Sequence, residues 1–227
     1  MSHSKIKYVL SERNHLLIYC SQSNKTDTLR ILTFFLLHII LAEVTMEQII
    51  LSLGSNQGNR LEYLKQAIKE LLKCTTGACI SSVYSTEPQD FKQQADFLNL
   101  VYVAQYNKDA ENLLKKTQSI EYKLGRHRHK AIPKGPRTID IDILAFGEHV
   151  IQTNTLIVPH PAMKKRQFVL IPLLEVLPNY AEPITKIPYK TYLEQLEDQG
   201  VQKYCSVREL NLEGFSIEEY TYGSECR

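Results

Sequence analysis

The chain has 227 residues, enough for one large domain or two small ones with a substantial buried core. Lysine and arginine number 27 against 25 acidic residues, and the net charge of +2 excludes binding that is dominated by net charge. A composition of 43% hydrophobic and 23% charged residues excludes both a disordered chain and a protein with many membrane spans. The 5 cysteines are irregularly spaced and include no CxxC pair, which indicates reduced thiols rather than a disulfide framework or a zinc ribbon.

The first 45 residues differ from the rest of the chain. Residues 1–30 show neither a helical nor a strand period, and the apolar run ILTFFLLHIILA follows at 31–42. This run is shorter than the roughly 20 residues that span a bilayer. It is interpreted as a membrane-surface anchor, a docking segment, or translated sequence upstream of a natural start at Met46. We favour the last interpretation and expect protein expressed from Met46 to be soluble and fully active.

From Met46 onward, apolar patterns and turn residues alternate in a readable order. Asn59 resembles the first residue of a helix capping box with Glu62, and Asp109 is placed to cap a second helix. We expect a strand at 48–53, a helix at 61–73, strands at 79–85 and 97–106, a helix at 110–124 and a strand at 138–146.

The order β-α-β-β-α-β predicts an α+β fold, a ferredoxin-like sandwich with an antiparallel sheet and both helices packed on one face. A further helical addition is expected at 167–177, with Pro172 separating its first turn from the rest. The predicted organisation is an N-terminal extension at 1–45, a catalytic domain at 46–180 and a tail at 181–227 to which the sequence assigns no role.

The candidate chemistry begins with the strand TIDIDIL. Alternate residues of a strand share a face, so the isoleucines at 139, 141 and 143 point to the core and Asp140 and Asp142 point the other way. Two neighbouring carboxylates repel each other and lose hydration, and a bound cation is the simplest compensation. The pattern alone leaves two alternatives open: both aspartates face water, or each pairs with an arginine.

A basic segment before this strand favours the metal. It contains Lys123, Arg126, Arg128, Lys130, Lys134 and Arg137. Cations around a floor of two carboxylates are typical of a magnesium–polyphosphate site. The chain has no GxxxxGK[ST] motif, no kinase HRD and DFG pair and no GxGxxG turn.

The sequence resembles the 6-hydroxymethyl-7,8-dihydropterin pyrophosphokinase family, folate-pathway enzymes that make AMP and the pterin diphosphate from ATP. The segments that carry the resemblance are LSLGSN (51–56), YSTEP (84–88), DFLN (96–99), GRHR (125–128), GPRTIDIDIL (135–144), VPH (158–160) and RQFVL (166–170). They extend over nearly all of 46–180, and the resemblance implies the same ferredoxin-like fold.

The resemblance also implies roles for individual residues. Asp140 and Asp142 match the aspartates that hold two Mg²⁺ ions on ATP, and Arg126 and Arg137 match catalytic arginines that neutralise phosphate. The other residues that match the ATP site are Gln118, Glu121, Arg128, His160 and Arg166. The residues that match the pterin site are Gly54, Thr86, Gln89, Phe97, Asn99 and Phe168, with Asn99 at the polar edge of the heterocycle and the two phenylalanines on its faces.

Three positions depart from the family pattern: Glu87, Lys134 and Pro161. They affect the expected packing of adenine and the closure of the loops 87–95 and 126–134, which we expect to close over the substrates. The expected enzyme is a cytoplasmic monomer that binds ATP and the pterin but no nucleic acid, and no membrane binding is expected for its catalytic domain.

Two other functions compete with this interpretation. An RNA-binding module would use the basic loop with Phe97, Tyr102 and Tyr106 on an exposed sheet face. A magnesium-dependent phosphohydrolase would share the metal site but use water as the acceptor. Formation of AMP only in the presence of the pterin alcohol distinguishes the transferase from both.

Overall fold

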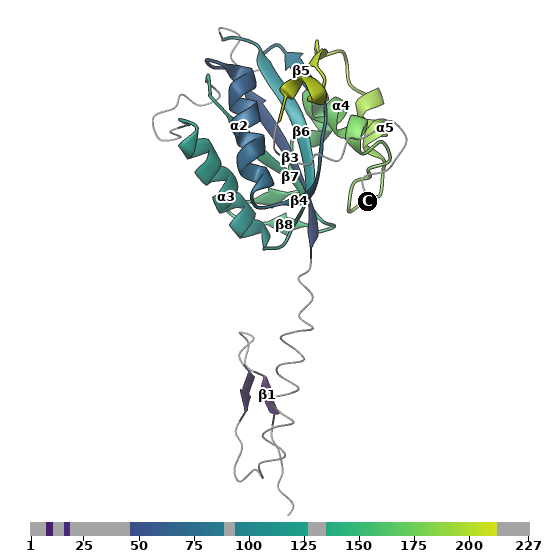
Figure 1. Ribbon diagram of the computed structural model, residues 1–227. Coiled ribbons are helices and arrows are strands. Elements are labelled where there is room, and N and C mark those ends of the chain that lie inside the picture. Colours follow the sequence, from purple (N-terminus) through teal and green to yellow (C-terminus); the bar gives the residue numbers. More distant parts are fainter. Residues whose placement is uncertain (1–7, 11–15, 19–45, 89–93, 127–134, 213–227) are drawn as a thin grey trace, which may run out of the picture. The chain divides into compact units, whose positions relative to one another are not determined.

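A computed structural model describes residues 8–10, 16–18, 46–88, 94–126 and 135–212. The chain divides into two compact units, 1–45 and 46–227 (Figure 1). In the first unit, β1 (Tyr8–Leu10) and β2 (Leu16–Ile18) form an antiparallel pair. Residues 1–30 show no strand period in the sequence, because strands of three residues are too short to produce one. The apolar run at 31–42 lies outside the described residues.

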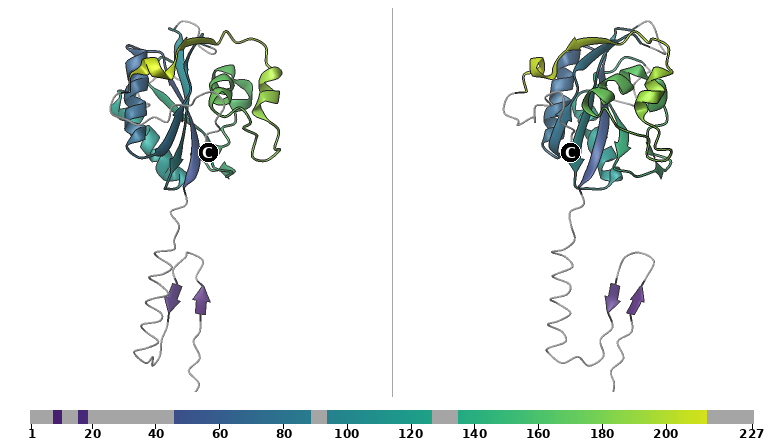
Figure 2. Two further views of the ribbon diagram at one scale, coloured as in Figure 1. Left: turned by 45° about the vertical axis from the view of Figure 1, so that its right-hand side comes forward. Right: turned by 90° about the vertical axis from the view of Figure 1, so that its right-hand side faces the viewer.

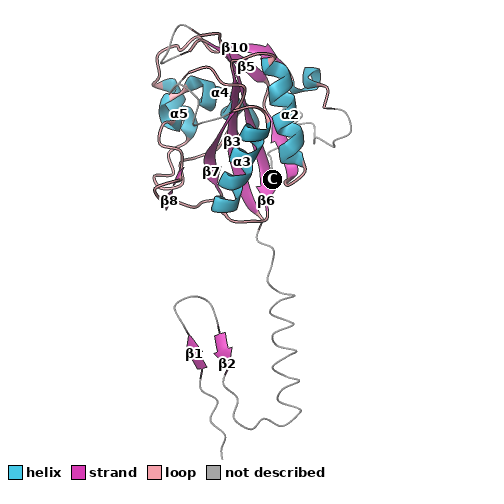
Figure 3. Cartoon of the chain, turned by 90° about the vertical axis from the view of Figure 1, so that its left-hand side faces the viewer, coloured by secondary structure: helices cyan, strands magenta, loops and turns pink. Residues whose placement is uncertain are grey.

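The second unit is built around one antiparallel sheet. Its elements are β3 (Glu47–Ser55), α2 (Arg60–Leu72), β4 (Thr76–Ile80), β5 (Val83–Thr86), β6 (Phe97–Tyr106), α3 (Ala110–Lys123), β7 (Asp140–Phe146), β8 (Ile151–Gln152), β9 (Ile157–Val158), η2 (Met163–Lys165), α4 (Gln167–Val176), α5 (Tyr189–Glu194), β10 (Gln202–Cys205) and η3 (Val207–Leu210). The strand order is β10-β5-β6-β3-β7, and β4 also pairs with β6. The predicted ferredoxin-like fold is confirmed, and α2 and α3 cover one face of the sheet (Figure 3).

The two predicted helix caps are present. Asn59 Oδ1 accepts a hydrogen bond from the backbone N–H of Glu62 at 3.3 Å, and Asp109 Oδ1 accepts one from the N–H of Asn112 at 2.7 Å. Both bonds satisfy donors that the first turn of a helix leaves unpaired. The helices then bury their apolar faces against β3 and its neighbours in one core, which includes Ile49, Leu51, Leu53, Leu64, Ile68, Leu71, Leu113 and Ile120.

The helices α4 and α5 lie on the opposite face of the sheet (Figure 2). A second apolar core lies between them and the sheet. It contains Ile50, Val101, Val103, Leu144, Val169, Leu170 and Leu173. The expectation that Pro172 separates the first turn of α4 is wrong, since the helix runs unbroken from Gln167 to Val176. Proline fixes a φ that a helix tolerates, and burial of the surrounding apolar side chains outweighs one missing backbone hydrogen bond.

The strand expected at 79–85 is two strands with a break at Ser81 and Ser82. The backbone N–H of Ser81 donates to the carbonyl of Val101 at 3.0 Å, and Ser81 Oγ accepts from the N–H of Val101 at 2.9 Å. The serine side chain thus replaces one link of the ladder. As a result, β4 pairs with the second half of β6 and β5 pairs with the first half.

Part of the segment 181–227 belongs to the same sheet. β10 pairs antiparallel with β5, with Gln202 opposite Ser85 and Lys203 opposite Tyr84. Among the described residues, Cys74, Cys79 and Cys205 form no disulfide bond. No helix in the described part of the chain combines the length and the apolar character needed to cross a bilayer.

Candidate active site

The sheet register brings the predicted site residues into rows. Gly54 on the central strand β3 lies opposite Asn99 on β6 and opposite Asp140 on β7. One step further along β3, on the same face, Ser52 lies opposite Asp142. This face is the one that Ile50, Val101 and Leu144 line beneath α4, so the polar residues continue an apolar surface toward one end of the sheet.

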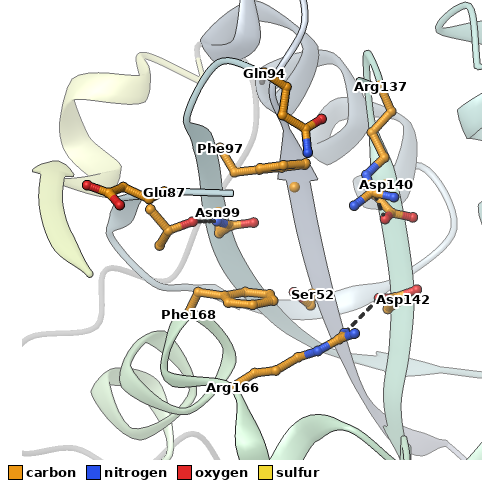
Figure 4. A pocket seen from close by; sticks show the side chains of 12 residues that line it. Ser52, Glu87, Gln94, Phe97, Asn99, Arg137, Asp140, Asp142, Arg166 and Phe168 are labelled. Atoms are coloured by element: carbon orange, nitrogen blue, oxygen red, sulfur yellow. Dashed lines mark hydrogen bonds and ion pairs between the residues drawn. The ribbon is translucent and has the colours of Figure 1, made fainter. Parts of the chain in front are cut away.

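These residues form the floor of a pocket. Its lining residues are Ser52, Gly54, Thr86, Glu87, Gln94, Phe97, Asn99, Arg137, Asp140, Asp142, Arg166 and Phe168. Phe97 begins β6 and Phe168 is the second residue of α4. Figure 4 shows the two phenyl rings on opposite sides of the pocket, with the Asn99 amide at the level between them. We call this space between Phe97 and Phe168 the aromatic slot.

The amide at the back of the slot is fixed in position. Asn99 is 4% exposed, and its Nδ2 donates to Thr86 Oγ1 at 2.8 Å. A Cβ atom at position 54 would lie 2.7 Å from Asn99 Oδ1, so the amide has room only because residue 54 is glycine. A buried amide held in this way presents a directional polar edge to a flat ligand in the slot.

The two aspartates lie beside the slot and have different neighbours. Asp140 is paired with both Arg126 and Arg137, and the distance from Arg137 Nε to Asp140 Oδ2 is 3.1 Å. Asp142 has a looser partner, with 3.9 Å between its Oδ2 and Arg166 NH1. Removal from bulk water and the negative charge of Asp140 raise the pKa of the Asp142 carboxyl. Two neighbouring carboxylates that repel each other in this way favour a bound cation.

Arg137 and Arg166 also contact the aromatic walls of the slot. The guanidinium carbon of Arg137 lies 5.0 Å from the ring centroid of Phe97, and that of Arg166 lies 5.5 Å from the ring of Phe168. A guanidinium at this distance is attracted to the face of a ring. The positive charges are therefore held between the carboxylates and the slot, where they can receive an anionic ligand.

Arg126 is held in position by Glu121. This glutamate is 1% exposed, pairs with Arg126 and accepts a hydrogen bond from the backbone N–H of Ile141 at 2.9 Å. It is not among the pocket-lining residues, and Gln118, which was also predicted for the ATP site, is exposed on α3 outside the lining. The structure thus assigns Glu121 to holding an arginine and brings neither residue into the pocket.

His160 lies close to the carboxylates on a tightly bonded turn. Its backbone N–H donates to the carbonyl of Leu144 at 2.9 Å, and its Nδ1 accepts from the N–H of Ala162 at 3.2 Å. Burial lowers the pKa of His160 against the opposing effect of Asp142. The imidazole is therefore favoured in its neutral form, which matches its Nδ1 acting as an acceptor.

Asn56 is a residue that the sequence reasoning did not single out as part of the site. Its Oδ1 accepts from the backbone N–H of Arg137 at 2.8 Å, and its Nδ2 donates to Gln94 Oε1 at 2.9 Å and to the carbonyl of Ala95 at 3.2 Å. It thereby joins the turn after β3 to the segments that carry Arg137 and Phe97. The signal was present in the segment LSLGSN, where an asparagine directly follows a buried strand. Ser52 and Gln94 were also missed as lining residues.

Some predicted residues lie outside the described part of the chain. They are Gln89 and Arg128, together with Lys134 and most of the two loops expected to close. Glu87 is described and lines the pocket, whereas Pro161 does not.

The donor set fits a divalent ion that is shared with a ligand. Within the described ranges, no three side chains of histidine, cysteine, aspartate or glutamate converge into a metal-binding group. Asp140 and Asp142 could supply one or two carboxylate oxygens, as Mg²⁺ sites do when substrate phosphates and water complete the coordination. Each ionised carboxylate has lone pairs beyond those that its arginine uses.

The tyrosines needed by an RNA-binding face are not accessible. Tyr102 is 0% exposed and Tyr106 is 3% exposed, and both belong to the core beneath α2 and α3. Stacking of bases requires an open ring face. Of the three aromatic residues considered for that role, only Phe97 lines the pocket.

Comparisons with known proteins agree with this geometry. The family model described as 7,8-dihydro-6-hydroxymethylpterin-pyrophosphokinase (HPPK) matches residues 50–178. A 2-amino-4-hydroxy-6-hydroxymethyldihydropteridine pyrophosphokinase of Aquifex aeolicus is 40% identical over 147 residues, which cover 65% of this chain and 91% of the relative. The corresponding protein of Bacillus subtilis is 44% identical over 128 residues, 56% of this chain and 75% of the relative.

Longer proteins match over the same region. The Folic acid synthesis protein fol1 of Pneumocystis carinii is 38% identical over 157 residues, so the match covers 69% of this chain and only 21% of that relative. The crystal structure of wild-type Plasmodium falciparum HPPK-DHPS matches with a TM-score of 0.55 and 15% identity, over 66% of this chain and 45% of that one, which supports the fold. The family match covers more than half of the chain, and the chain therefore belongs to the 7,8-dihydro-6-hydroxymethylpterin-pyrophosphokinase (HPPK) family.

Proposed function

We propose that this protein transfers the pyrophosphoryl group of ATP to the hydroxymethyl group of 6-hydroxymethyl-7,8-dihydropterin, giving AMP and the pterin diphosphate for folate synthesis. Membership of the HPPK family supports the reaction. The observation that supports these particular residues is one pocket in which the aromatic slot adjoins two carboxylates and their arginines. The slot suits a flat heterocycle, and the charged half suits a metal-bound polyphosphate.

The pterin occupies the aromatic slot. Stacking between Phe97 and Phe168 contributes roughly 1–3 kcal/mol per aromatic contact, by analogy with base stacking. The amide of Asn99 hydrogen-bonds the polar edge of the heterocycle, held in place by Thr86 and by the absence of a side chain at Gly54. Gln89, which lies outside the described residues, remains part of this proposed pterin site.

ATP binds in the charged half of the pocket. Asp140 and Asp142 would hold two Mg²⁺ ions, which would neutralise and orient the triphosphate. Arg126, Arg137 and Arg166 supply positive charge at hydrogen-bonding range of these carboxylates or close to it. His160 and Arg128 complete the proposed ATP contacts. Among the described residues, His160 lies outside the pocket lining, as do Glu121 and Gln118.

Catalysis depends on position and charge. The hydroxymethyl oxygen attacks the β-phosphorus of ATP and loses its proton to water, and AMP leaves as the bond between the β-phosphorus and the oxygen that bridges it to the α-phosphate breaks. The slot fixes the nucleophile in orientation, and the arginines stabilise the charge that develops on the phosphates. The paired carboxylates and guanidinium groups are pre-arranged by the sheet and by Asn56, so they need little reorganisation during the reaction.

We propose further that the enzyme is a cytoplasmic monomer. The two substrates of the proposed reaction are small polar molecules.

The decisive experiment measures AMP formation by the full chain with ATP and Mg²⁺, with and without the pterin alcohol. AMP that requires both the pterin and the metal supports the proposal, and Asp142→Asn serves as the inactive control. Release of ADP or phosphate without the pterin would instead support a phosphohydrolase. Retention of single-stranded RNA without turnover would support the nucleic-acid module.

A further inference from the structure

The segment 197–205 lies beyond the residues that match the family model, yet it contacts the wall of the pocket. Gln167, the first residue of α4, donates from Nε2 to the carbonyl of Glu197 at 3.0 Å. A few residues later, β10 pairs with β5, whose last residue, Thr86, holds the Asn99 amide. We call residues 197–205 the strap.

The strap and α4 are joined by a reciprocal pair of glutamines. The backbone N–H of Gln167 donates to Gln199 Oε1 at 2.9 Å, and the backbone N–H of Gln199 donates to Gln167 Oε1 at 2.9 Å. Gln199 Nε2 also donates to the carbonyl of Lys165 at 3.0 Å. One side-chain amide therefore holds backbone groups on both sides of Arg166.

These bonds have a local physical reason. The first N–H groups of a helix have no partner within the helix, and Arg166 at the N-cap of α4 makes no capping bond with its side chain. Gln199 therefore takes the place of the usual capping residue. Arg166 itself has extended backbone angles, φ −123° and ψ 106°, between η2 and α4. Gln199 fixes the chain at this change of direction.

Gln167, the residue that Gln199 holds, lies between two proposed binding residues. Arg166 extends toward Asp142, and Phe168 forms one wall of the aromatic slot (Figure 4). The other end of the strap is anchored as well, because Lys203 Nζ lies 3.5 Å from Glu175 Oε1, and Glu175 accepts hydrogen bonds from Ser82. The strap thus connects α4, which carries one wall of the slot, to β5.

We propose that the strap sets the position of Phe168 and Arg166, with Gln199 as the positioning residue. This inference rests on the proposed function, since Arg166 and Phe168 are assigned there to ATP and to the pterin. Without the capping amide, the first turn of α4 frays, the slot widens and the guanidinium loses its fixed direction. Binding of both substrates is therefore weakened. The surroundings of the reacting phosphate, formed by Asp140, Arg126 and Arg137, are unchanged.

The test compares steady-state kinetics of full-length Gln199→Ala with those of the exposed control Gln195→Ala, which lies outside the strap. We expect Gln199→Ala to raise the KM of the pterin and of ATP by about three- to tenfold, with kcat within about twofold of the wild type. Gln199→Glu can still accept from Gln167 but cannot donate to Lys165, and a smaller rise is expected. Gln195→Ala should match the wild type.

A double-mutant cycle distinguishes positioning from general destabilisation. In a Phe168→Ala background, Gln199→Ala should change the pterin KM by less than about twofold, because the wall that it positions is gone. The inference is overturned if Gln199→Ala leaves both KM values unchanged, whether or not it lowers kcat and the melting temperature. It is also overturned if the effect of Gln199→Ala on the pterin KM is the same in both backgrounds. Absence of AMP from the wild-type protein would refute the proposed function instead.

Discussion

Gly54→Ala tests whether binding of the pterin requires the Asn99 amide in the position that it has in the structure. The added Cβ would lie 2.7 Å from Asn99 Oδ1 and 3.8 Å from Phe97 Cδ1. Gly54 is not one of the glycines with positive φ, so alanine brings no backbone strain and the effect is steric. The amide is buried and bonded to Thr86, and it can move away only by giving up that bond.

The expected size follows from this geometry. The contact is about 0.7 Å shorter than the 3.4 Å at which ordinary Cβ contacts begin, and overpacking of this kind typically costs about 1–3 kcal/mol. Loss of the hydrogen bond between Asn99 and Thr86 contributes about 0.5–1.5 kcal/mol of that. The loss of one hydrogen bond at the edge of the bound pterin, also about 0.5–1.5 kcal/mol, weakens pterin binding roughly two- to tenfold.

The assay combines titration calorimetry of the pterin with denaturant unfolding of Gly54→Ala, Asn99→Ala and the double variant. In the double variant the atom that the new Cβ meets is absent, so its stability should lie within about 0.5 kcal/mol of Asn99→Ala. Pterin affinity should stay low in all three. Wild-type affinity in Gly54→Ala would refute the role of Asn99, and a stability loss that persists in the double variant would refute the steric reasoning.

Three further predictions concern charges. Asp142→Asn should abolish AMP formation with little change in the free energy of unfolding, because it removes one charge from a crowded pair; retained turnover would remove Asp142 from the metal site. Arg137→Ala should lower kcat by about 10²- to 10³-fold and weaken pterin binding far less, as compared by kinetics and calorimetry, and the reverse pattern would make it a substrate-binding residue. Hydrogen bonds from Lys123 and Lys73 lower the pKa of Glu70 to about 2. Since the folded pKa lies below the usual 4.5, the stability advantage of wild type over Glu70→Gln should be full above about pH 4.5 and vanish as the pH falls through about 2. Both lysines are more than half exposed, so the advantage should be at most about 1 kcal/mol, and a gap that denaturant titrations find independent of pH would contradict it.

Features that depend on neighbouring residues in the sequence were predicted well. The alternation along β7 was correct, with Ile141 buried in the core and both aspartates at the pocket. The caps at Asn59 and Asp109 were correct for the same reason, since each depends on a group three residues away. Local periodicity and capping chemistry are sufficient for such features.

Features that join distant parts of the chain were not predicted from the residues. The need for glycine at position 54 arises from Asn99, which becomes its neighbour only through the register of β3 and β6. The bonds of Gln199 to the start of α4 join residues more than thirty positions apart, and no period or turn signal marks them. Glu121 was assigned to the ATP site by resemblance, and only the packing reveals its burial under Arg126.

Two arginine side chains serve both halves of the pocket. Arg137 lies 3.1 Å from Asp140 and 5.0 Å from the ring of Phe97, and Arg166 lies 3.9 Å from Asp142 and 5.5 Å from the ring of Phe168. Each guanidinium is planar, so it can meet a carboxylate with its edge and a ring with its face, which a lysine ammonium cannot do. The charge that meets a polyphosphate is therefore the same charge that supports a wall of the slot. For this reason a substitution at either arginine should disturb both substrates, and the ratio of the two effects reports which contact carries more of the binding free energy.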